Sequence, residues 1–251
     1  MQPLTFKDHF STQSGIYAKY RPGYPRELYT FLAGLTPEHA LAWDCGTGNG
    51  QAAIGLAEFY DHLIATDPSH EQINNCTPHP KISYRVETAE TNTLPANAAD
   101  LLTVATALHW FNLDVFYKEA ARVLKPHGVI AAWTANTPTV SPQVDDVIKQ
   151  LHDDILGDYW LAENHLAGDG YANIYFPFQQ IDCPVFTSGK TMTLEDMTGY
   201  LNTWSAVQRY NNMHGNNPVG MIQTALAEAW GNPSLERLVV WTLKVKAGRK
   251  L

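Results

Sequence analysis

The feature that most constrains this chain is a glycine-rich segment, residues 42–50, which reads Ala-Trp-Asp-Cys-Gly-Thr-Gly-Asn-Gly. An apolar stretch runs into one acidic residue, Asp44, and glycine then occupies alternate positions. Alternating glycines allow a sharp turn, and they let a ligand approach closer than side chains would permit. We therefore predict a strand that ends near Asp44, followed by a loop that binds a nucleoside cofactor. The Asp44 carboxylate can accept hydrogen bonds from an ammonium group of that cofactor.

A dinucleotide-binding loop is the main alternative for this segment. Such a loop has its third glycine after two intervening residues, and counted from Gly46 that position is Gln51. A count that starts at Gly48 and runs through Gly50 to Ala53 does fit the looser form of the motif. A nicotinamide-dependent oxidoreductase therefore stays open at this point.

Composition narrows the class of protein. The chain is 45% hydrophobic, which is enough for a sizeable core, and its net charge of −8 disfavours nucleic acid as the main partner. It has no apolar stretch of membrane-helix length and does not start like a secretory signal, so we expect a cytoplasmic protein without membrane contact. The cysteines Cys45, Cys76 and Cys183 are expected to be reduced thiols, and the scattered histidines predict no metal site.

Strand-like and helix-like segments alternate along residues 25–133. Apolar stretches, helical spacing of apolar residues, and proline or glycine at element ends define them. The expected strands cover residues 40–45, 62–67, 82–87, 100–106 and 129–133. The expected helices cover residues 25–35, 52–59, 68–76 and 115–124. This alternation predicts an α/β fold with a doubly wound, mostly parallel sheet, helices on both faces, and ligands bound beyond the carboxyl ends of the strands.

The pattern changes after residue 133. Residues 134–142 are polar, contain two prolines, and predict a connector. Further helices are expected over residues 144–166, 194–210 and 219–230, and strands over residues 176–193 and 238–245. We therefore expect an N-terminal cap segment with the first helix (1–36), a cofactor-binding core (37–136) and a C-terminal part that completes the ligand pocket and the sheet (137–251).

Further polar residues follow the second and third expected strands. Asp67 lies 23 residues after Asp44, a separation that suits a carboxylate binding both ribose hydroxyls and excludes a cofactor with a 2′-phosphate. Alternatively, Asp67 caps the helix that starts at Pro68. Ala89 and Glu90 lie where an adenine edge would meet backbone donors, although Glu90 is equally well explained as a solvated loop carboxylate.

The fourth expected strand ends in Thr106-Ala107-Leu108-His109-Trp110, which places an imidazole and an indole beside the expected cofactor. Histidine titrates near neutral pH, so His109 is a candidate base or a group that holds an acceptor oxygen. The competing interpretation is a half-buried structural histidine. Trp110 either walls the pocket, with its ring face attracting a cation, or packs between sheet and helix.

Several segments together resemble a known family. They are residues 17–25 (Tyr-Ala-Lys-Tyr-Arg-Pro-Gly-Tyr-Pro), 44–50, 67, 89–90, 109–110 and 122–128 (Arg-Val-Leu-Lys-Pro-His-Gly). This order resembles class I S-adenosylmethionine-dependent methyltransferases, most closely the type 11 group that includes trans-aconitate methyltransferase-like proteins. The resemblance is close over residues 16–135. It departs at His127, where the family usually has the first glycine of a Gly-Gly pair.

The resemblance implies a seven-stranded Rossmann-like sheet with an antiparallel last strand at residues 238–245. It implies S-adenosylmethionine as cofactor and in-line methyl transfer to a small organic acceptor, with a carboxylate or hydroxyl oxygen favoured. Three alternatives stay open: a non-catalytic nucleoside-binding protein, the oxidoreductase above, and a transfer-RNA methyltransferase, which the acidic composition disfavours.

The residue patterns and the resemblance together assign residues to the site. The cofactor-binding residues would be Asp44, Gly46, Thr47, Gly48, Asp67, Pro68, Ala89, Glu90, Thr106 and Ala107. The acceptor-binding residues would be Tyr17, Arg21, Trp110, Trp133 and Trp204. His109 would be the catalytic residue. Arg21 has a second interpretation, in which it orients its own segment by hydrogen bonds to backbone carbonyls.

Overall fold

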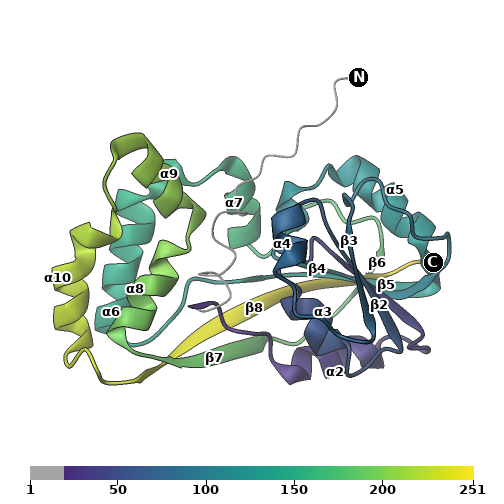
Figure 1. Ribbon diagram of the computed structural model, residues 1–251, viewed down its shortest axis with the longest axis horizontal. Helices are drawn as coiled ribbons and strands as arrows, with labels where there is room; N and C mark the ends of the chain where they lie inside the picture. Colours follow the sequence, from purple (N-terminus) through teal and green to yellow (C-terminus); the bar gives the residue numbers. More distant parts are fainter. Residues whose placement is uncertain (1–19) are drawn as a thin grey trace.

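The computed structural model describes residues 20–251. Figure 1 shows a helix-covered sheet on one side and a group of helices on the other, with β7 (Phe186–Met192) and β8 (Arg237–Arg249) running between them. The strand order is β3-β2-β1-β4-β5-β8, and β6 (Gln179–Ile181) and β7 both pair with β8 along its other edge. In residues 20–251, eight strands therefore occupy seven positions in the sheet. β8 is antiparallel to β5, which confirms the expected antiparallel last strand.

The parallel part of the sheet and its helices match the expected elements. The strands are β1 (Leu41–Cys45), β2 (His62–Asp67), β3 (Ile82–Val86), β4 (Ala99–Ala105) and β5 (Leu124–Ala135). The helices are α2 (Arg26–Gly34), α3 (Gln51–Leu56), α4 (His70–Asn74) and α5 (Leu113–Val123). The chain runs from β1 outward to β2 and β3 and then returns to place β4 on the other side of β1. The carboxyl ends of β1 and β4 are therefore the point where a sheet of this kind binds its ligand.

β5 starts earlier than expected. The segment 125–128, predicted to separate a helix from a strand, belongs to β5, and the ladder with β4 shifts its register between Ala99 and Leu101. His127 takes a left-handed φ of 64°, a conformation that glycine adopts more readily, and its N–H donates to the Lys250 carbonyl. The irregularity lets the strand continue past Pro126, which cannot donate to a ladder.

Three single elements expected after β5 are each divided. In place of one helix over 144–166 there are α6 (Pro142–Lys149), a π-helical segment (Gln150–Ile155), a 3₁₀ turn (Gly157–Tyr159) and α7 (Ala162–Gly168). In place of one strand over 176–193 there are β6 and β7, because Pro184 interrupts the pairing. The helix expected over 194–210 is divided into α8 (Leu194–Asn202) and α9 (Ser205–His214), whereas α10 (Val219–Trp230) has the predicted bounds.

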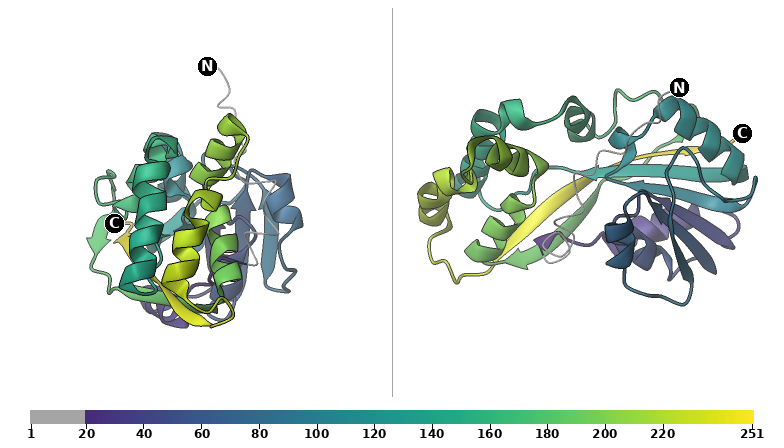
Figure 2. Two further views of the ribbon diagram at one scale, coloured as in Figure 1. Left: turned by 90° about the vertical axis from the view of Figure 1, so that its left-hand side faces the viewer. Right: turned by 45° about the horizontal axis from the view of Figure 1, so that its top comes forward.

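Apolar clusters cover both faces of the sheet. Consecutive residues of β4 point to opposite faces, so Leu101 packs with α2 and α3 while Leu102 packs with α5. A third cluster joins α6, α8, α9 and α10 to the ends of β7 and β8 around Trp230 and Trp241. Figure 2 shows α6, α8 and α10 side by side at that end of the molecule. The core and the helical part therefore share the long strand β8.

Candidate cofactor site

The glycine loop follows β1 at the carboxyl edge of the sheet. The N–H groups of Gly46 and Thr47 both donate to the Thr66 carbonyl, at 2.8 and 2.9 Å, which fixes the loop to the end of β2. Gly46, Gly48 and Gly50 have φ values of 68°, 55° and 85°. Glycine populates this left-handed region without the steric penalty that a side chain brings. The loop therefore needs glycine at these three positions, because its backbone is left-handed at each of them.

The two faces of the loop differ in what surrounds them. A Cβ on Gly46 would lie 2.7 Å from the Cβ of Ala107 and 3.1 Å from the Phe111 ring. A Cβ on Gly48 would meet nothing closer than the Gln72 Oε1 atom, at 4.0 Å. Gly46 therefore packs against the chain after β4, whereas Gly48 borders open space of the kind that a ligand needs.

Asp44 is completely buried at the end of β1. Its carboxylate accepts hydrogen bonds from the Thr47 hydroxyl, from the Thr103 hydroxyl at 2.8 Å, and from the backbone N–H of Ala53. Burial raises the pKa of Asp44 to about 6, although these hydrogen bonds favour the charged form. Asp44 thus ties the loop to β4 and α3. Its contact with a cofactor ammonium group stays a prediction.

Asp67 joins the glycine loop to α4. Its Oδ2 accepts from the Gly48 N–H at 3.0 Å, and its Oδ1 accepts from the Ser69 N–H at 2.9 Å. The residue that caps α4 is Ser69, whose Oγ accepts from the Gln72 N–H at 3.2 Å. The capping role considered for Asp67 is therefore filled by Ser69. Pro68, between the two, is half-buried, and the ribose contact of Asp67 stays a prediction.

Glu90 has a partner that neither sequence interpretation included. Its Oε1 accepts from the Asn112 N–H at 2.8 Å, just before α5 begins. Glu90 therefore fixes the start of α5 from a partly exposed position, and its contact with the adenine stays a prediction. Ala89 beside it is buried at 5% exposure in the apolar cluster of this face of the sheet, and its contact with the adenine stays a prediction.

His109 lies in a short 3₁₀ helix, Leu108–Trp110, and is only 7% exposed. Its Nδ1 is 3.1 Å from the Tyr171 hydroxyl, and its ring centre is 4.8 Å from that of half-buried Trp110. Burial lowers the pKa of His109 to about 4, with Glu163 opposing the shift, so the imidazole is neutral at pH 7. This pKa lies below the neutral range expected from the sequence, and the Tyr171 hydroxyl is a polar partner of the buried ring. No local signal in the sequence points to Tyr171.

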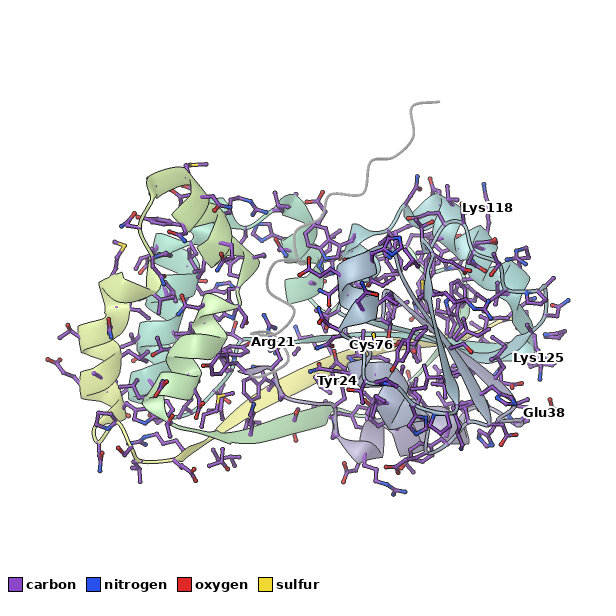
Figure 3. All side chains as sticks on the ribbon, in the orientation of Figure 1. Arg21, Tyr24, Glu38, Cys76, Lys118 and Lys125 are labelled. Carbon is purple, nitrogen blue, oxygen red and sulfur yellow. The ribbon has the colours of Figure 1, made fainter. Side chains whose placement is uncertain are left out.

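A narrow pocket adjoins this edge of the sheet. The polar and aromatic residues among its described lining are Arg21, Tyr24, Gln51, Thr106, Ser188 and Trp241. Thr106 follows β4 with a left-handed φ of 55°, and Gln51 is the first residue of α3. In Figure 3, Arg21 and Tyr24 lie between α8 and the core helices α3 and α4. The pocket therefore joins the core to β7 and β8.

The expected acceptor residues other than Trp110 lie in three different environments or outside the described part of the chain. Arg21 donates from its Nε to the Thr203 hydroxyl at 3.1 Å, and both of its sequence interpretations stay predictions. Trp133 is fully buried at the end of β5, with its ring edge against Tyr24 and its indole N–H unpartnered. Trp204 is 5% exposed and packs in the helical cluster against Trp160 and His152. Tyr17 lies outside the described residues.

Two findings concern other classes of site. Within residues 20–251, no three His, Cys, Asp or Glu side chains are close enough together to hold a metal ion. In the same part of the chain, no helix combines the length and the apolar character that a membrane crossing requires. The three cysteines are unpaired thiols.

Comparison with known proteins decides the family. Residues 43–132 match the family model described as a methyltransferase domain. A Dictyostelium discoideum protein, provisionally named a methyltransferase, is 32% identical over 232 residues, which cover 91% of this chain and 88% of that protein. The chain belongs to the class I S-adenosylmethionine-dependent methyltransferases. This methyltransferase is also similar to a solved structure from Anaeromyxobacter dehalogenans, which is provisionally described as a type II methyltransferase. The two are 38% identical with a TM-score of 0.86, and the match covers 92% of this chain and 98% of that one.

A more distant solved structure shares the fold alone. A protein from Anabaena variabilis, provisionally assigned as a methyltransferase of an antibiotic biosynthesis pathway, has a TM-score of 0.55 at 16% identity. It covers 89% of this chain, and 98% of that structure is matched. The cofactor of the family is S-adenosylmethionine, and the glycine loop fits it. Gly48 borders open space, and two carboxylates lie at neighbouring strand ends.

Proposed function

We propose that this methyltransferase methylates a carboxylate oxygen of a small organic acceptor. The observation that supports this choice is the lining of the pocket beside Thr106. Its described residues include hydroxyl groups, aromatic rings and the Arg21 cation, but no Asp, Glu or His. A carboxylate is already a nucleophile, whereas a hydroxyl or an amine must lose a proton to a base. A pocket wall without a base therefore favours a carboxylate, which agrees with the resemblance to trans-aconitate methyltransferase-like proteins.

The residues of this chain would bind the cofactor and the acceptor, orient them relative to each other, and exclude water from the site. Bound S-adenosylmethionine supplies an activated methyl group, so the protein chiefly needs to align the acceptor oxygen with it. We assign cofactor binding to the residues expected from the sequence, with Asp44 at the amino-acid end and Asp67 at the ribose. Trp110 would form an apolar wall of the acceptor position. Residues 137–251 would complete the pocket through α8, β7 and β8.

A labelled methyl donor tests the proposed function. The protein is incubated with S-adenosylmethionine carrying a trideuterated methyl group and with a metabolite extract, and products three mass units heavier are sought. A methyl ester is expected, which mild base hydrolyses back to the parent acid. A labelled product that resists base would contradict the carboxylate assignment, and labelled transfer RNA would contradict a small acceptor. Heat-inactivated protein serves as the control.

His109 provides a second prediction. Because burial lowers its pKa to about 4, the imidazole is a weak base, and we propose that it holds the acceptor by a hydrogen bond instead of taking its proton. The pH profile of turnover near pH 6.5 should then have the same shape in the native enzyme and in His109→Ala, since burial lowers the pKa of His109 to about 4 and an inflection near pH 6 belongs to Asp44. The variant His109→Ala should lower turnover by about 5- to 10-fold, the value of one hydrogen bond, with affinity for S-adenosylhomocysteine nearly unchanged. Turnover is measured from pH 5.5 to 9, and affinity by calorimetric titration.

Tyr171→Phe is the matched control for His109. It removes the hydroxyl that contacts the imidazole and leaves the ring in place. Turnover should fall less than in His109→Ala. If His109→Ala weakens turnover and cofactor affinity equally, His109 has a structural role and the catalytic assignment fails.

A further inference from the structure

A short turn, residues 169–174, follows α7 and is held by side chains of β5 and β8. Thr134 of β5 and Lys244 of β8 are partners in the antiparallel ladder, and both donate to the end of α7. The Thr134 hydroxyl donates to the Ala167 carbonyl at 2.9 Å, and the Lys244 ammonium group donates to the Gly168 carbonyl at 3.3 Å. The last carbonyls of a helix have no partner within the helix, so these donors fix the place where α7 ends.

Lys246 holds the turn itself. It lies two residues after Lys244 in β8 and therefore on the same face of the sheet. Its ammonium group donates to the carbonyls of Tyr171 at 2.8 Å, Ile174 at 3.0 Å and Ala172 at 3.4 Å. An ammonium group has three N–H donors, so these carbonyls use all of them. Tyr171 has a left-handed φ of 64°, which a residue other than glycine keeps only when its surroundings fix it. Lys246 is part of what fixes it.

The Tyr171 side chain extends from this turn to His109. It is fully buried, and its hydroxyl oxygen lies 3.1 Å from His109 Nδ1. Burial raises the pKa of Tyr171, so the phenol keeps its proton, although hydrogen bonds from the backbone N–H groups of Leu108 and His109 to its oxygen oppose that rise. An oxygen that accepts from backbone N–H groups still has its own proton to donate, and His109 Nδ1 is an acceptor within reach.

The contact between Tyr171 and His109 selects one of the two neutral forms of the imidazole. A neutral imidazole carries one proton, and the hydrogen bond at one ring nitrogen decides whether the other nitrogen holds it. We propose that Tyr171 donates to Nδ1 of His109 and so places the imidazole proton on Nε2, and that Lys246 is a positioning residue that holds Tyr171 there. The Nε2–H group is then a donor that an acceptor oxygen can use. That use rests on the proposed function, whereas the tautomer and the role of Lys246 do not.

Nitrogen NMR of protein that carries isotope-labelled histidine tests the tautomer. Protonated and unprotonated ring nitrogens resonate far apart, and the His109 signals are those missing from the spectrum of His109→Gln at pH 7. The native protein should show an unprotonated Nδ1 and a protonated Nε2. Tyr171→Phe should shift the ratio of the two tautomers about 3- to 10-fold toward Nδ1–H, the value of one hydrogen bond. A native protein with the proton on Nδ1, or an unchanged ratio in Tyr171→Phe, would overturn the proposal.

Lys246→Met tests the positioning role. It removes the ammonium group from a side chain of similar length, and it should shift the tautomer ratio in the same direction as Tyr171→Phe. Lys246→Arg keeps a charged donor and should shift the ratio less. If Lys246→Met loses thermal stability but gives the native His109 signals, the contact is only structural and the positioning role fails.

Lys81→Met is the matched control for Lys246→Met. The Lys81 ammonium group also donates to backbone carbonyls, those of Ala57 and Tyr60, both at 3.0 Å. Lys81 directly precedes β3, at the amino end of that strand, whereas His109 follows the carboxyl end of β4. Lys81→Met should therefore lower thermal stability and leave the His109 signals unchanged.

Turnover separates this inference from the proposed function. If the Nε2 proton of His109 holds the acceptor, Lys246→Met should lower turnover by about 3- to 10-fold, with affinity for S-adenosylhomocysteine nearly unchanged. A shifted tautomer ratio with unchanged turnover would support the role of Lys246 and contradict the proposed role of His109. The NMR measurements need no methyl transfer, so they remain valid if the acceptor class proves wrong.

Discussion

Gly48→Ala is expected to weaken S-adenosylhomocysteine binding by at least about 100-fold and to cost only about 1 kcal/mol of folding free energy, the strain of a left-handed alanine. Gly48 has a φ of 55°, and the nearest atom to a new Cβ would be 4.0 Å away. The new methyl group therefore meets no protein atom closely. It fills the open space beside the loop, where we place the cofactor.

Gly46→Ala should have its main effect on stability. Its φ of 68° brings the same strain, and the new Cβ would also lie 2.7 Å from Ala107 and 3.1 Å from Phe111. Overpacking of this kind adds about 1 to 3 kcal/mol. Urea unfolding at 25 °C measures the stability of each variant, and calorimetric titration measures its affinity.

Gly215→Ala is the control for both variants. Gly215 ends α9 with a φ of 72° and has no atom within 4 Å of a new Cβ, so it carries the strain without the ligand. We expect it to lose about 1 kcal/mol and to keep full affinity. If the Gly48→Ala and Gly215→Ala proteins bind S-adenosylhomocysteine equally well, the glycine loop is not the binding edge.

The core was predictable because its signals are local. Continuous apolar stretches mark the parallel strands, and glycine or proline marks the ends of the helices between them. The carboxyl ends of parallel strands meet at one edge, so Asp44 and Asp67 could be placed near each other without a structure. Where an element depends on a distant partner, local signals failed. β5 extends back to Leu124 because it pairs with β4 and its His127 meets Lys250 at the far end of the chain.

The parts of the site that were missed depend on tertiary contacts. α8 ends without glycine or proline at Thr203, whose hydroxyl bonds back to the Tyr200 carbonyl. The same hydroxyl receives Arg21, 182 residues earlier in the chain, and His109 is covered by Tyr171, 62 residues later. Contacts over such separations leave no periodic pattern in the sequence. The neutral state of His109 and the orientation of Arg21 therefore required the structure.

Asp44→Asn is expected to stabilise the protein at pH 7, by at most about 3 kcal/mol, while it weakens cofactor binding. Burial raises the pKa of Asp44 from 3.8 to about 6. Because the Asp44 carboxyl has a higher pKa in the folded protein than in the unfolded chain, the unfolded chain ionises at a lower pH. The folding free energy that Asp44 contributes is therefore lost as the pH rises from 3.8, and the loss is complete above about pH 6. A shift of this size, at about 1.4 kcal/mol per pH unit, gives at most about 3 kcal/mol at pH 7 and roughly half of that at pH 5. Asparagine cannot ionise and can still bond to the Thr47 and Thr103 hydroxyls, which rotate to accept or donate.

Asp100→Asn is the matched control, because the same substitution there should have the opposite sign. Asp100 is also buried, but its carboxylate accepts from the Lys125 ammonium group at 2.6 Å and from the Leu41 N–H at 2.9 Å. Removal of a paired charge should cost about 1 to 3 kcal/mol. Urea unfolding at pH 5 and pH 7 checks both signs and the pH dependence of the gain. A stabilised Asp44→Asn protein with weakened affinity would mean that Asp44 is kept for its charge toward the cofactor ammonium group, at the expense of the fold. A destabilised protein with unchanged affinity would mean that Asp44 only holds the loop together.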